Sequence, residues 1–540
     1  MGRNLEGQQR QSVGRGNVPS GLSSSYSCQL ILRSLFVAVA IATSFITLSC
    51  TSRRDPRTVV MLIESGPLNL DPRIGTDAES ERIDELIFDS LIRRDSHANL
   101  LPWLAESWEV PDPLTYIFHL HQNIHFHDGQ LLTSRDVRYT FESLLSGEVS
   151  SIKASTFGLI NSIKTPDDST VIFHLKEPYA SFMWNLTQGG IGIVSANAPR
   201  NLAQRPLGTG PFRFVSSRQD DEVVLDRNPN YWGTAPQIER VSFKIVPDAT
   251  TRALELRKGS ADILLNSLTA DMVEVLRREG NLRIAREPGN SYQYLAFNLA
   301  DSRLTPPVRQ AIAYGIDRQA LITYLWRNMA RPADSILPPE NWAHAPDLQT
   351  YPHDPRKANE LLDRAGLNPG SDGIRLHLVM KASTDQTARE LAAVLQEQLR
   401  QIGVALDIRT FEFATFYADL TKGSFELYSL RWVSGNDDPD IFDYCFDSRK
   451  FPPAGANRGH YFNPEADRLI EHARVSPNRD DRRQDYIELQ KILNRDLPYV
   501  HLWYMDNVSV YNRRIQNLRL AATSDYNFLT TIEIAGPKRR

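Results

Sequence analysis

Cysteine is scarce in this chain of 540 residues, which contains only three: Cys28, Cys50 and Cys445. The first two lie within and directly after an amino-terminal segment that has the features of a targeting signal. Cys445 is therefore left without a cysteine partner, and we expect no intramolecular disulfide bond. Burial of apolar side chains must then supply the stability of the fold.

A strong excess of charge of either sign is also missing. The formal net charge is -4, and because residues 1–49 carry +3, the rest of the chain carries -7. Proteins that bind nucleic acid normally present a basic surface, so we expect no nucleic-acid partner. With 41% hydrophobic and 23% charged residues, the composition is that of a soluble globular protein, long enough to form two lobes or more.

Sequence motifs for catalysis are absent as well. The chain has no HExxH, no CxxC pair, no Walker A sequence and no GxSxG, so the common zinc hydrolases, redox dithiols, nucleotide hydrolases and serine esterases are excluded. Residues 150–153, SSIK, fit the SxxK pattern of penicillin-binding enzymes but lack the SDN and KTG motifs that accompany it. We therefore expect no enzymatic activity and no cofactor.

Two clusters of metal-binding residue types need another explanation. The histidines are His119 and His121, on one face of a predicted strand, with His125 and His127 after a break in it. We interpret them as structural and predict no metal site. The second cluster consists of four acidic residues, Asp437, Asp438, Asp440 and Asp443. These carboxylates could bind calcium, but an Asp-Pro turn on a solvated loop explains them better.

The amino terminus has the pattern of a secretion signal. The apolar run from Leu35 to Leu48 follows Arg33 and is too short to cross a bilayer comfortably, so we predict a signal peptide over residues 1–49. The sequence TLSC at 47–50 resembles the lipobox of bacterial lipoproteins, which implies that Cys50 is lipidated and that residues 50–57 form a tether. Cleavage by an ordinary signal peptidase is the alternative.

The stretch from Thr115 to Val137 is the most informative one for the fold. Tyr116, Phe118 and Leu120 alternate with Ile117, His119 and His121, which is the period of a strand whose two faces have different surroundings. Asp128-Gly129 is a turn pair, and the stretch as a whole predicts a strand, a turn, a second strand and a helix entry. Thr133 and Asp136 have the spacing of a helix cap. On the following helix the buried stripe is predicted to contain Val137, Phe141 and Leu144, with Tyr139 pointing elsewhere.

Other segments have clear patterns too. Thr58–Ile63 is an apolar run that suits a strand buried on both faces, and a helix is predicted to begin near Glu79 and to carry Ile83, Leu86, Ile87 and Leu91. Residues 376–408 read as a strand, a helix and a second strand. The segments 294–298 and 497–503 belong to the family resemblance given next, which implies that they are the first crossover strand and the return crossover.

The order of several motifs carries a family resemblance. They are LDP at 70–72, PWLAESW at 102–108, the stretch at 115–137, GTGPF at 208–212 and PYVHLW at 498–503. In this order they resemble the solute-binding proteins of bacterial peptide and nickel ABC importers, over about residues 58–535. The resemblance implies an α/β, two-lobed periplasmic binding protein fold of type II, hinged by two crossover strands, with an extra subdomain inserted in the first lobe.

The resemblance also implies domain boundaries and a function. Lobe I is expected over 58–297 with its inserted subdomain at about 100–205, lobe II over 298–504, and a return to lobe I over 505–540. The protein would be a monomer, anchored by lipid in the periplasm or at the cell surface, that captures a peptide or similar small solute in the interlobe cleft and delivers it to an ABC permease. The alternatives are a metal chelate, a sugar or an opine-like solute as ligand, and a tethered cell-wall peptide hydrolase.

Three stretches are expected to contact the ligand. By alignment with the family, the backbone of Thr76, Asp77 and Ala78 pairs with an extended peptide by strand addition. Tyr139 matches a position that lines the cleft. Trp432 ends a predicted strand, where a rigid aromatic ring can cover an apolar ligand side chain.

The loop after Trp432 departs from the family. Its residues Ser434, Gly435, Asn436 and Asp437 are predicted ligand contacts. In peptide binders the loop supplies an aspartate to the peptide's free amine, but Gly435 takes that place here, and a buried ammonium without a carboxylate costs several kcal/mol. Asn436 or Asp437 could substitute. Arg458 is a further candidate, because a guanidinium can bind a carboxylate or phosphate through two parallel hydrogen bonds; the alternative is a structural role as a donor to loop carbonyls.

Overall fold

A computed structural model describes residues 55–535 except 96–98, 188–190, 200 and 434–437. The predicted signal peptide, Cys50 and the loop residues Ser434 to Asp437 therefore lie outside the described residues. Within them, no helix combines the length and the apolar character needed to cross a membrane. Cys445 is a buried free thiol.

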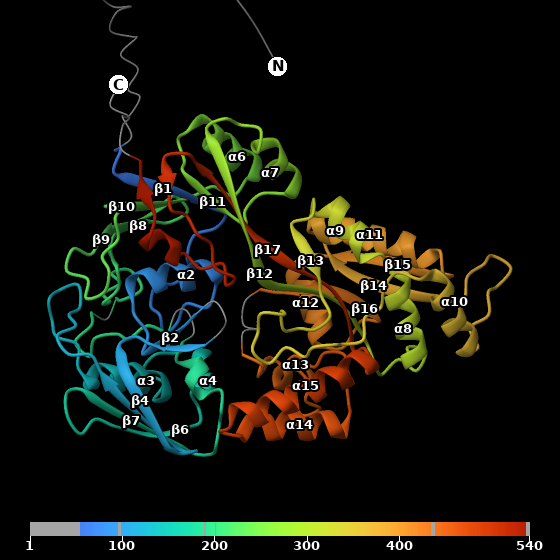
Figure 1. The fold of residues 1–540 in the computed structure, drawn as a ribbon, viewed down its shortest axis with the longest axis horizontal. Coiled ribbons are helices and arrows are strands. Elements are labelled where there is room, and N and C mark those ends of the chain that lie inside the picture. Colours follow the sequence, from blue (N-terminus) through green and yellow to red (C-terminus); the bar gives the residue numbers. More distant parts are fainter. Residues whose placement is uncertain (1–54, 96–98, 188–190, 200, 434–437, 536–540) are drawn as a thin grey trace, which may run out of the picture. The chain divides into compact units, whose positions relative to one another are not determined.

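One mixed sheet runs through the molecule and contains both crossover strands (Figure 1). The strands that pass between its two ends are β12 (Leu282–Phe297) and β17 (Tyr499–Asn512), which pair antiparallel along most of their length. We call the elements before β12 together with the chain after β17 the first lobe, and those between β12 and β17 the second lobe. The predicted crossover at 294–298 and its return at 497–503 both fall on these strands. The exact lobe boundaries stay a prediction.

The first lobe is built around β1, which lies in the middle of its part of the sheet. β1 pairs parallel with both β10 and β11, and all but its first residue is buried, as predicted for an apolar strand covered on both faces. The elements of this part are β1 (Thr58–Ile63), α2 (Ala78–Ile87), β2 (Ile92–Arg94), β3 (Leu100–Pro102), β8 (Phe212–Arg218), β9 (Glu222–Arg227), β10 (Arg240–Ile245), α6 (Ala249–Lys258), β11 (Ile263–Leu265), α7 (Ala270–Leu276), β18 (Ile515–Gln516), the 3-10 helix η1 (Asn527–Thr530) and β19 (Glu533–Ile534).

A separate four-stranded sheet, ordered β4-β5-β7-β6, is inserted between β3 and β8. The helix α3 packs on it, and Val137, Phe141 and Leu144 are at most 1% exposed in the shared core, as their spacing predicts. Thr133 and Asp136 form the predicted capping box. The elements of this subdomain are β4 (Ala105–Asp112), β5 (Thr115–Leu120), α3 (Ser134–Leu145), α4 (Lys153–Thr156), β6 (Ile160–Lys164), β7 (Thr170–Leu175) and α5 (Phe182–Asn185).

The second lobe contains the predicted strand-helix-strand unit. β14 and β15 pair parallel and α11 connects them, with its apolar stripe buried against the sheet. The elements are α8 (Pro306–Gly315), α9 (Arg318–Leu325), β13 (Ala330–Pro332), α10 (Pro355–Arg364), β14 (Leu376–Ser383), α11 (Gln386–Arg400), β15 (Val404–Phe411), α12 (Phe413–Thr421), β16 (Leu427–Trp432), α13 (Ile441–Phe446), α14 (Pro464–Val475) and α15 (Arg479–Asp496).

Two local predictions are wrong. The second strand expected after Asp128-Gly129 does not form. The residues after the turn make two backbone hydrogen bonds with those before it, from Phe126 N–H to the Gln130 carbonyl and from Leu132 N–H to the Ile124 carbonyl, and only an isolated bridge joins His125 and Leu131. Leu91 is not on the helix that begins near Glu79. α2 ends at Ile87, since Phe88 is extended, and Leu91 is buried in the core of the inserted subdomain.

Candidate functional site

Trp432 ends β16 beside the crossover strand β12, where it pairs with Tyr292. Its ring lies parallel to that of Tyr294, with 6.5 Å between the ring centroids, and meets the ring of Tyr444 edge-on at 6.2 Å. The indole nitrogen is buried and has no hydrogen-bond partner in the described part of the chain. The ring is thus held rigidly, and part of it stays accessible, as is needed for a surface that covers a ligand.

Arg458 lies next to Trp432, although it is distant from it in sequence. Its guanidinium carbon is 5.7 Å from the centre of the Trp432 ring and 5.0 Å from that of Tyr417, and Nη2 donates to Tyr417 Oη at 2.8 Å. Arg458 is only 4% exposed. Its Nη1 is buried without a partner among the described residues. Two aromatic rings therefore fix the position of this cation, as cation–π contacts do.

Arg458 stays protonated in this environment. Burial by itself would lower its pKa, but the nearby hydroxyls of Tyr428, Tyr294 and Tyr499 raise it, so that the pKa lies above the ordinary arginine value. Arg458 is therefore a permanent positive charge in a mostly apolar cluster. A carboxylate or phosphate that reached Nη1 would meet an arginine that is already oriented.

An exposed aromatic surface adjoins Arg458. We call it the aromatic wall and define it as Phe413, Tyr417, Trp432 and Tyr444, from α12, β16 and α13. Phe413, Tyr417 and Tyr444 are 55%, 41% and 44% exposed, which is high for large aromatic side chains; Phe413 stacks on Tyr417, and Tyr444 contacts Trp432. Exposed apolar patches of this kind mark binding surfaces. Sequence reasoning found Trp432 and Arg458 but missed the other three rings.

The predicted strand-addition segment lies at the start of α2. Asp77 is the N-cap of the helix, since its carboxylate accepts from the Ser80 amide, and its carbonyl accepts from Glu81. Ala78 is the first helical residue. Thr76 is exposed, and its backbone has no hydrogen bond within the described ranges. Of the three residues, Thr76 therefore presents the backbone groups best suited to pair with a ligand.

Tyr139 lies on α3, off the buried stripe, as predicted. Its hydroxyl donates to Glu148 Oε1 at 3.2 Å, and the guanidinium carbon of Arg73 is 5.7 Å from the ring centre. Arg73 in turn is fixed by Asp71 through two hydrogen bonds. Tyr139 is half-buried against the core of the first lobe, near the segment that precedes Thr76. Its role as a ligand contact stays a prediction.

The residues that follow the 434–437 loop contact the inserted subdomain. Tyr179 Oη donates to Asp440 Oδ2 at 2.7 Å, and Ser181 Oγ donates to Asp438 Oδ1 at 3.1 Å. Arg482 Nη2 lies 3.6 Å from the same Asp438 oxygen. Burial, and then the charge of Asp438, raise the pKa of Asp440 to about 6. These two carboxylates hold the second lobe against the subdomain.

In the described part of the chain no group of histidine, cysteine or acidic residues could hold a metal ion.

Asp89, in the segment that follows α2, was not singled out from the sequence and is the acceptor of a hydrogen-bond network in the first lobe. Its buried carboxylate accepts four side-chain hydrogen bonds of 2.8–3.2 Å, from Trp103, Thr209, Tyr231 and Trp232. Burial raises the pKa of Asp89, and these four donors oppose the shift. Thr209 of the GTGPF motif therefore has a structural role, because its hydroxyl is one of these donors.

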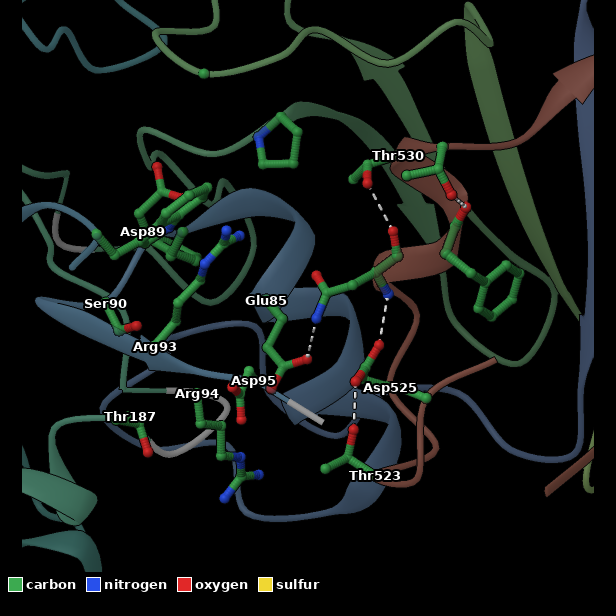
Figure 2. Close-up of a pocket in the computed structure, with 18 of the residues that line it drawn as sticks. Glu85, Asp89, Ser90, Arg93, Arg94, Asp95, Thr187, Thr523, Asp525 and Thr530 are labelled. Carbon is green, nitrogen blue, oxygen red and sulfur yellow. Dashed lines mark hydrogen bonds between the residues drawn. The ribbon is translucent and has the colours of Figure 1, made fainter. Parts of the chain in front are cut away.

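Beside Asp89 lies a cavity of about 860 Å³, and the described residues that line it all belong to the first lobe. Glu85 and Asp89 come from the α2 segment, Arg93 and Arg94 from β2, and Asp525 from the segment after β17 (Figure 2). Apolar side chains complete the lining, among them Phe88, Ile191 and Phe528. This combination of apolar walls and a few polar groups is typical of small-molecule sites.

Comparison with known proteins agrees with this architecture. Residues 99–451 match the bacterial extracellular solute-binding proteins, family 5 Middle. The chain belongs to this family. The chain is similar to the solved structure of the Helicobacter pylori ABC transporter-associated periplasmic binding protein DppA in complex with the peptide STSA. That protein is 26% identical with a TM-score of 0.73, and the match covers 89% of this chain and 98% of that one. The predicted two-lobed fold is thereby confirmed.

The names of two further similar proteins refer to different solutes. The dipeptide-binding protein of Escherichia coli is 26% identical over 84% of this chain and 90% of its own length. The NikZ structure from Campylobacter jejuni, in complex with Ni(L-His), is 25% identical with a TM-score of 0.75, and the match covers 88% of this chain and 99% of that one. The relatives are binding proteins, not enzymes.

Proposed function

We propose that this family 5 protein is the substrate-binding lipoprotein of an ABC importer, anchored outside the cytoplasmic membrane through Cys50, which captures short peptides and delivers them to a membrane permease as a monomer. Ligand exchange, not chemistry, is its mechanism. The ligand would lie against the aromatic wall. Its binding would favour the closed form of the protein, because only in that form do both lobes contact the ligand.

The main support for the proposal is the aromatic wall together with Arg458, which lies against its members Tyr417 and Trp432. A short peptide offers an apolar or aromatic side chain and a terminal carboxylate, and the two match the Trp432 ring and the guanidinium of Arg458. Thr76 on the first lobe supplies unpaired backbone groups, which extended peptides recognise. The loop residues Ser434 to Asp437 would complete the site, with Asn436 or Asp437 near the ligand.

Replacing Trp432 with alanine should weaken peptide binding by about 30-fold, since a well-packed aromatic contact contributes about 2 kcal/mol. The affinities of Ala-Phe and Ala-Ala-Phe would be measured by titration calorimetry, and closure by small-angle scattering. Trp432→Phe should keep most of the affinity. Phe462→Ala removes a 69% exposed ring of the second lobe outside the aromatic wall and serves as the control.

The proposal is wrong if no member of a broad pool of di- and tripeptides binds or reduces the radius of gyration. Binding of a nickel–histidine complex or a sugar instead would keep the fold's general role and change the ligand class. Steady release of product from cell-wall muropeptides would favour a hydrolase.

A further inference from the structure

The second lobe meets the inserted subdomain in a compact polar contact. Tyr179 and Ser181 of the subdomain donate to two carboxylates of the second lobe. Next to them the Ala180 amide donates to the Arg474 carbonyl at 2.8 Å, and the Arg474 guanidinium lies 3.3 Å from a carboxylate oxygen of Glu177. We call this set the interlobe contact and define it as residues 177–181 with Asp438, Asp440, Arg474 and Arg482.

The interlobe contact is shielded from water. Ser181 and Arg482 are buried, and Arg482 Nη2 donates to Ser181 Oγ at 3.2 Å. One oxygen of Asp440, Oδ1, is also buried, and among the residues that the structure describes it has no hydrogen-bond donor. Separation of the two lobes would break the hydrogen bonds that join them and expose these groups to water. The contact can therefore exist only while the lobes are together.

The carboxylates of the contact outnumber the cations that are available to them. Asp438 and Asp440 lie near one guanidinium, that of Arg482, which is 3.6 Å from Asp438. The other cation, Arg474, is paired with two glutamates. The hydrogen bond to Asp440 Oδ2 comes from the neutral hydroxyl of Tyr179. A buried carboxylate that no cation neutralises takes up a proton more readily than an exposed one.

A third acidic residue, Asp443, lies near Asp440 on the same lobe. Burial, and then the charge of Asp440, raise the pKa of Asp443 to about 6. Lys450 Nζ lies 3.4 Å from Asp443 Oδ2 and partly opposes the shift. Asp443 and Lys450 belong to one lobe, so separation of the lobes does not by itself break their contact. Asp440, which bonds to the other lobe, is the residue whose surroundings must change.

The other ionisable groups beside Asp440 keep one charge state. Burial raises the pKa of Tyr179 and of Tyr486 above the ordinary value, so both stay neutral. Burial by itself would lower the pKa of Arg474 and of Arg482, but the groups beside them raise it above the ordinary value, so both stay charged. These four residues therefore add no proton exchange of their own near neutral pH.

We propose that the interlobe contact is a latch that holds the two lobes closed, and that Asp440 makes the latch tighten in acid, because the closed form keeps a proton on this carboxyl group that the open form releases. The proposal rests on the proposed function, since lobe closure is what would trap a solute. The latch itself needs no ligand.

The direction of the pH effect follows from the burial of Asp440. In the open form its carboxyl group is exposed and has the ordinary aspartate pKa of about 3.9. In the closed form burial, and then the charge of Asp438, raise the pKa of Asp440 to about 6. A pKa that rises on closure favours the closed form as the pH falls through this range. The ratio of closed to open molecules should therefore increase about tenfold from pH 7 to pH 5.

Hydrogen exchange at the Ala180 amide measures this ratio directly, because its bond to the Arg474 carbonyl joins the two lobes. In the ligand-free protein the protection of this amide, corrected for the intrinsic exchange rate, should be about tenfold higher at pH 5 than at pH 7. The matched control is the Leu175 amide, which donates to the Leu114 carbonyl at 2.8 Å within the subdomain. Its protection should not depend on pH, and it shows that each variant is folded.

Variants assign the effect to Asp440. Asp440→Asn imitates the protonated acid, so Ala180 protection at pH 7 should rise about tenfold and no longer change with pH. Tyr179→Phe removes a hydrogen bond between the lobes and should lower the protection at both pH values. Glu397→Gln, at an exposed position on α11, should change neither. Equal protection of the wild type at pH 5 and pH 7, or a wild-type pH response in Asp440→Asn, would overturn the proposal.

The exchange measurement also separates the latch from the proposed function, because it needs no ligand. A protein that binds no peptide but shows the pH response at Ala180 would refute the peptide role and support the latch. Peptide binding without any pH response at Ala180 would refute the latch and leave the peptide role intact.

Discussion

Replacing Asp89 with alanine is expected to lower the free energy of unfolding by about 3–5 kcal/mol, the range for breaking a buried charged network by removing one partner. The substitution leaves four buried or half-buried donors without an acceptor, on Trp103, Thr209, Tyr231 and Trp232. Each unsatisfied donor carries a desolvation penalty that the native carboxylate removes. Equilibrium denaturation in urea measures the loss.

The Asp89 prediction has an internal comparison. Asp89→Asn keeps one acceptor oxygen but turns an amide NH₂ toward the remaining donors. The free energy of unfolding of this variant should therefore fall between that of the wild type and that of the alanine variant. Asp221→Ala, which removes an exposed carboxylate from the same lobe, should change the free energy of unfolding by less than 1 kcal/mol. A value within 1 kcal/mol of the wild type for Asp89→Ala would show that the four hydrogen bonds do not hold the lobe together.

Replacing Arg458 with methionine should weaken the binding of a short peptide about 30- to 150-fold, because a hydrogen bond to a charged group contributes about 2–3 kcal/mol where water is excluded. Methionine fills much of the space between the rings of Tyr417 and Trp432 but has no charge. Arg458→Lys should not restore the affinity, since an ammonium lacks the planar fork that stacks between two rings. Titration calorimetry gives the affinities.

A chemical change in the ligand makes the Arg458 test specific. If Arg458 binds the terminal carboxylate, amidation of the peptide should weaken its binding to the wild type but leave its affinity for Arg458→Met almost unchanged. This difference is the coupling energy that a double-mutant cycle measures. Arg409→Met, at an exposed position on β15, is the matched control. Equal sensitivity of wild type and Arg458→Met to amidation would mean that Arg458 is structural.

Local patterns in the sequence were sufficient for many elements. β1 could be predicted because burial on both faces leaves an unbroken apolar run, and the β14-α11-β15 unit because its strand and helix periods differ clearly. The missed second strand near Asp128 shows the limit. Just before that turn, the His127 amide donates to the Gly208 carbonyl of the GTGPF motif, a partner distant in sequence that no local pattern indicates.

The candidate sites could be predicted only in part, for the same reason. Trp432 was recognisable because it ends a predicted strand, but Tyr417 and Arg458 come close to it only through the folding of the second lobe. The cavity left a local signal that could have been used: α2 carries Glu79, Glu81, Asp84 and Glu85 within ten residues of a helix that also packs into the core. What the sequence did not contain is that Asp525 lies opposite them.

The most direct measurement of the central claim is native mass spectrometry of the protein purified without denaturation, since a closed binding protein can retain cellular ligand. The account predicts a series of bound masses that match short peptides, exchangeable for an added tripeptide and absent from Trp432→Ala. A protein that carries no added mass, before and after incubation with a pool of di- and tripeptides, would contradict it.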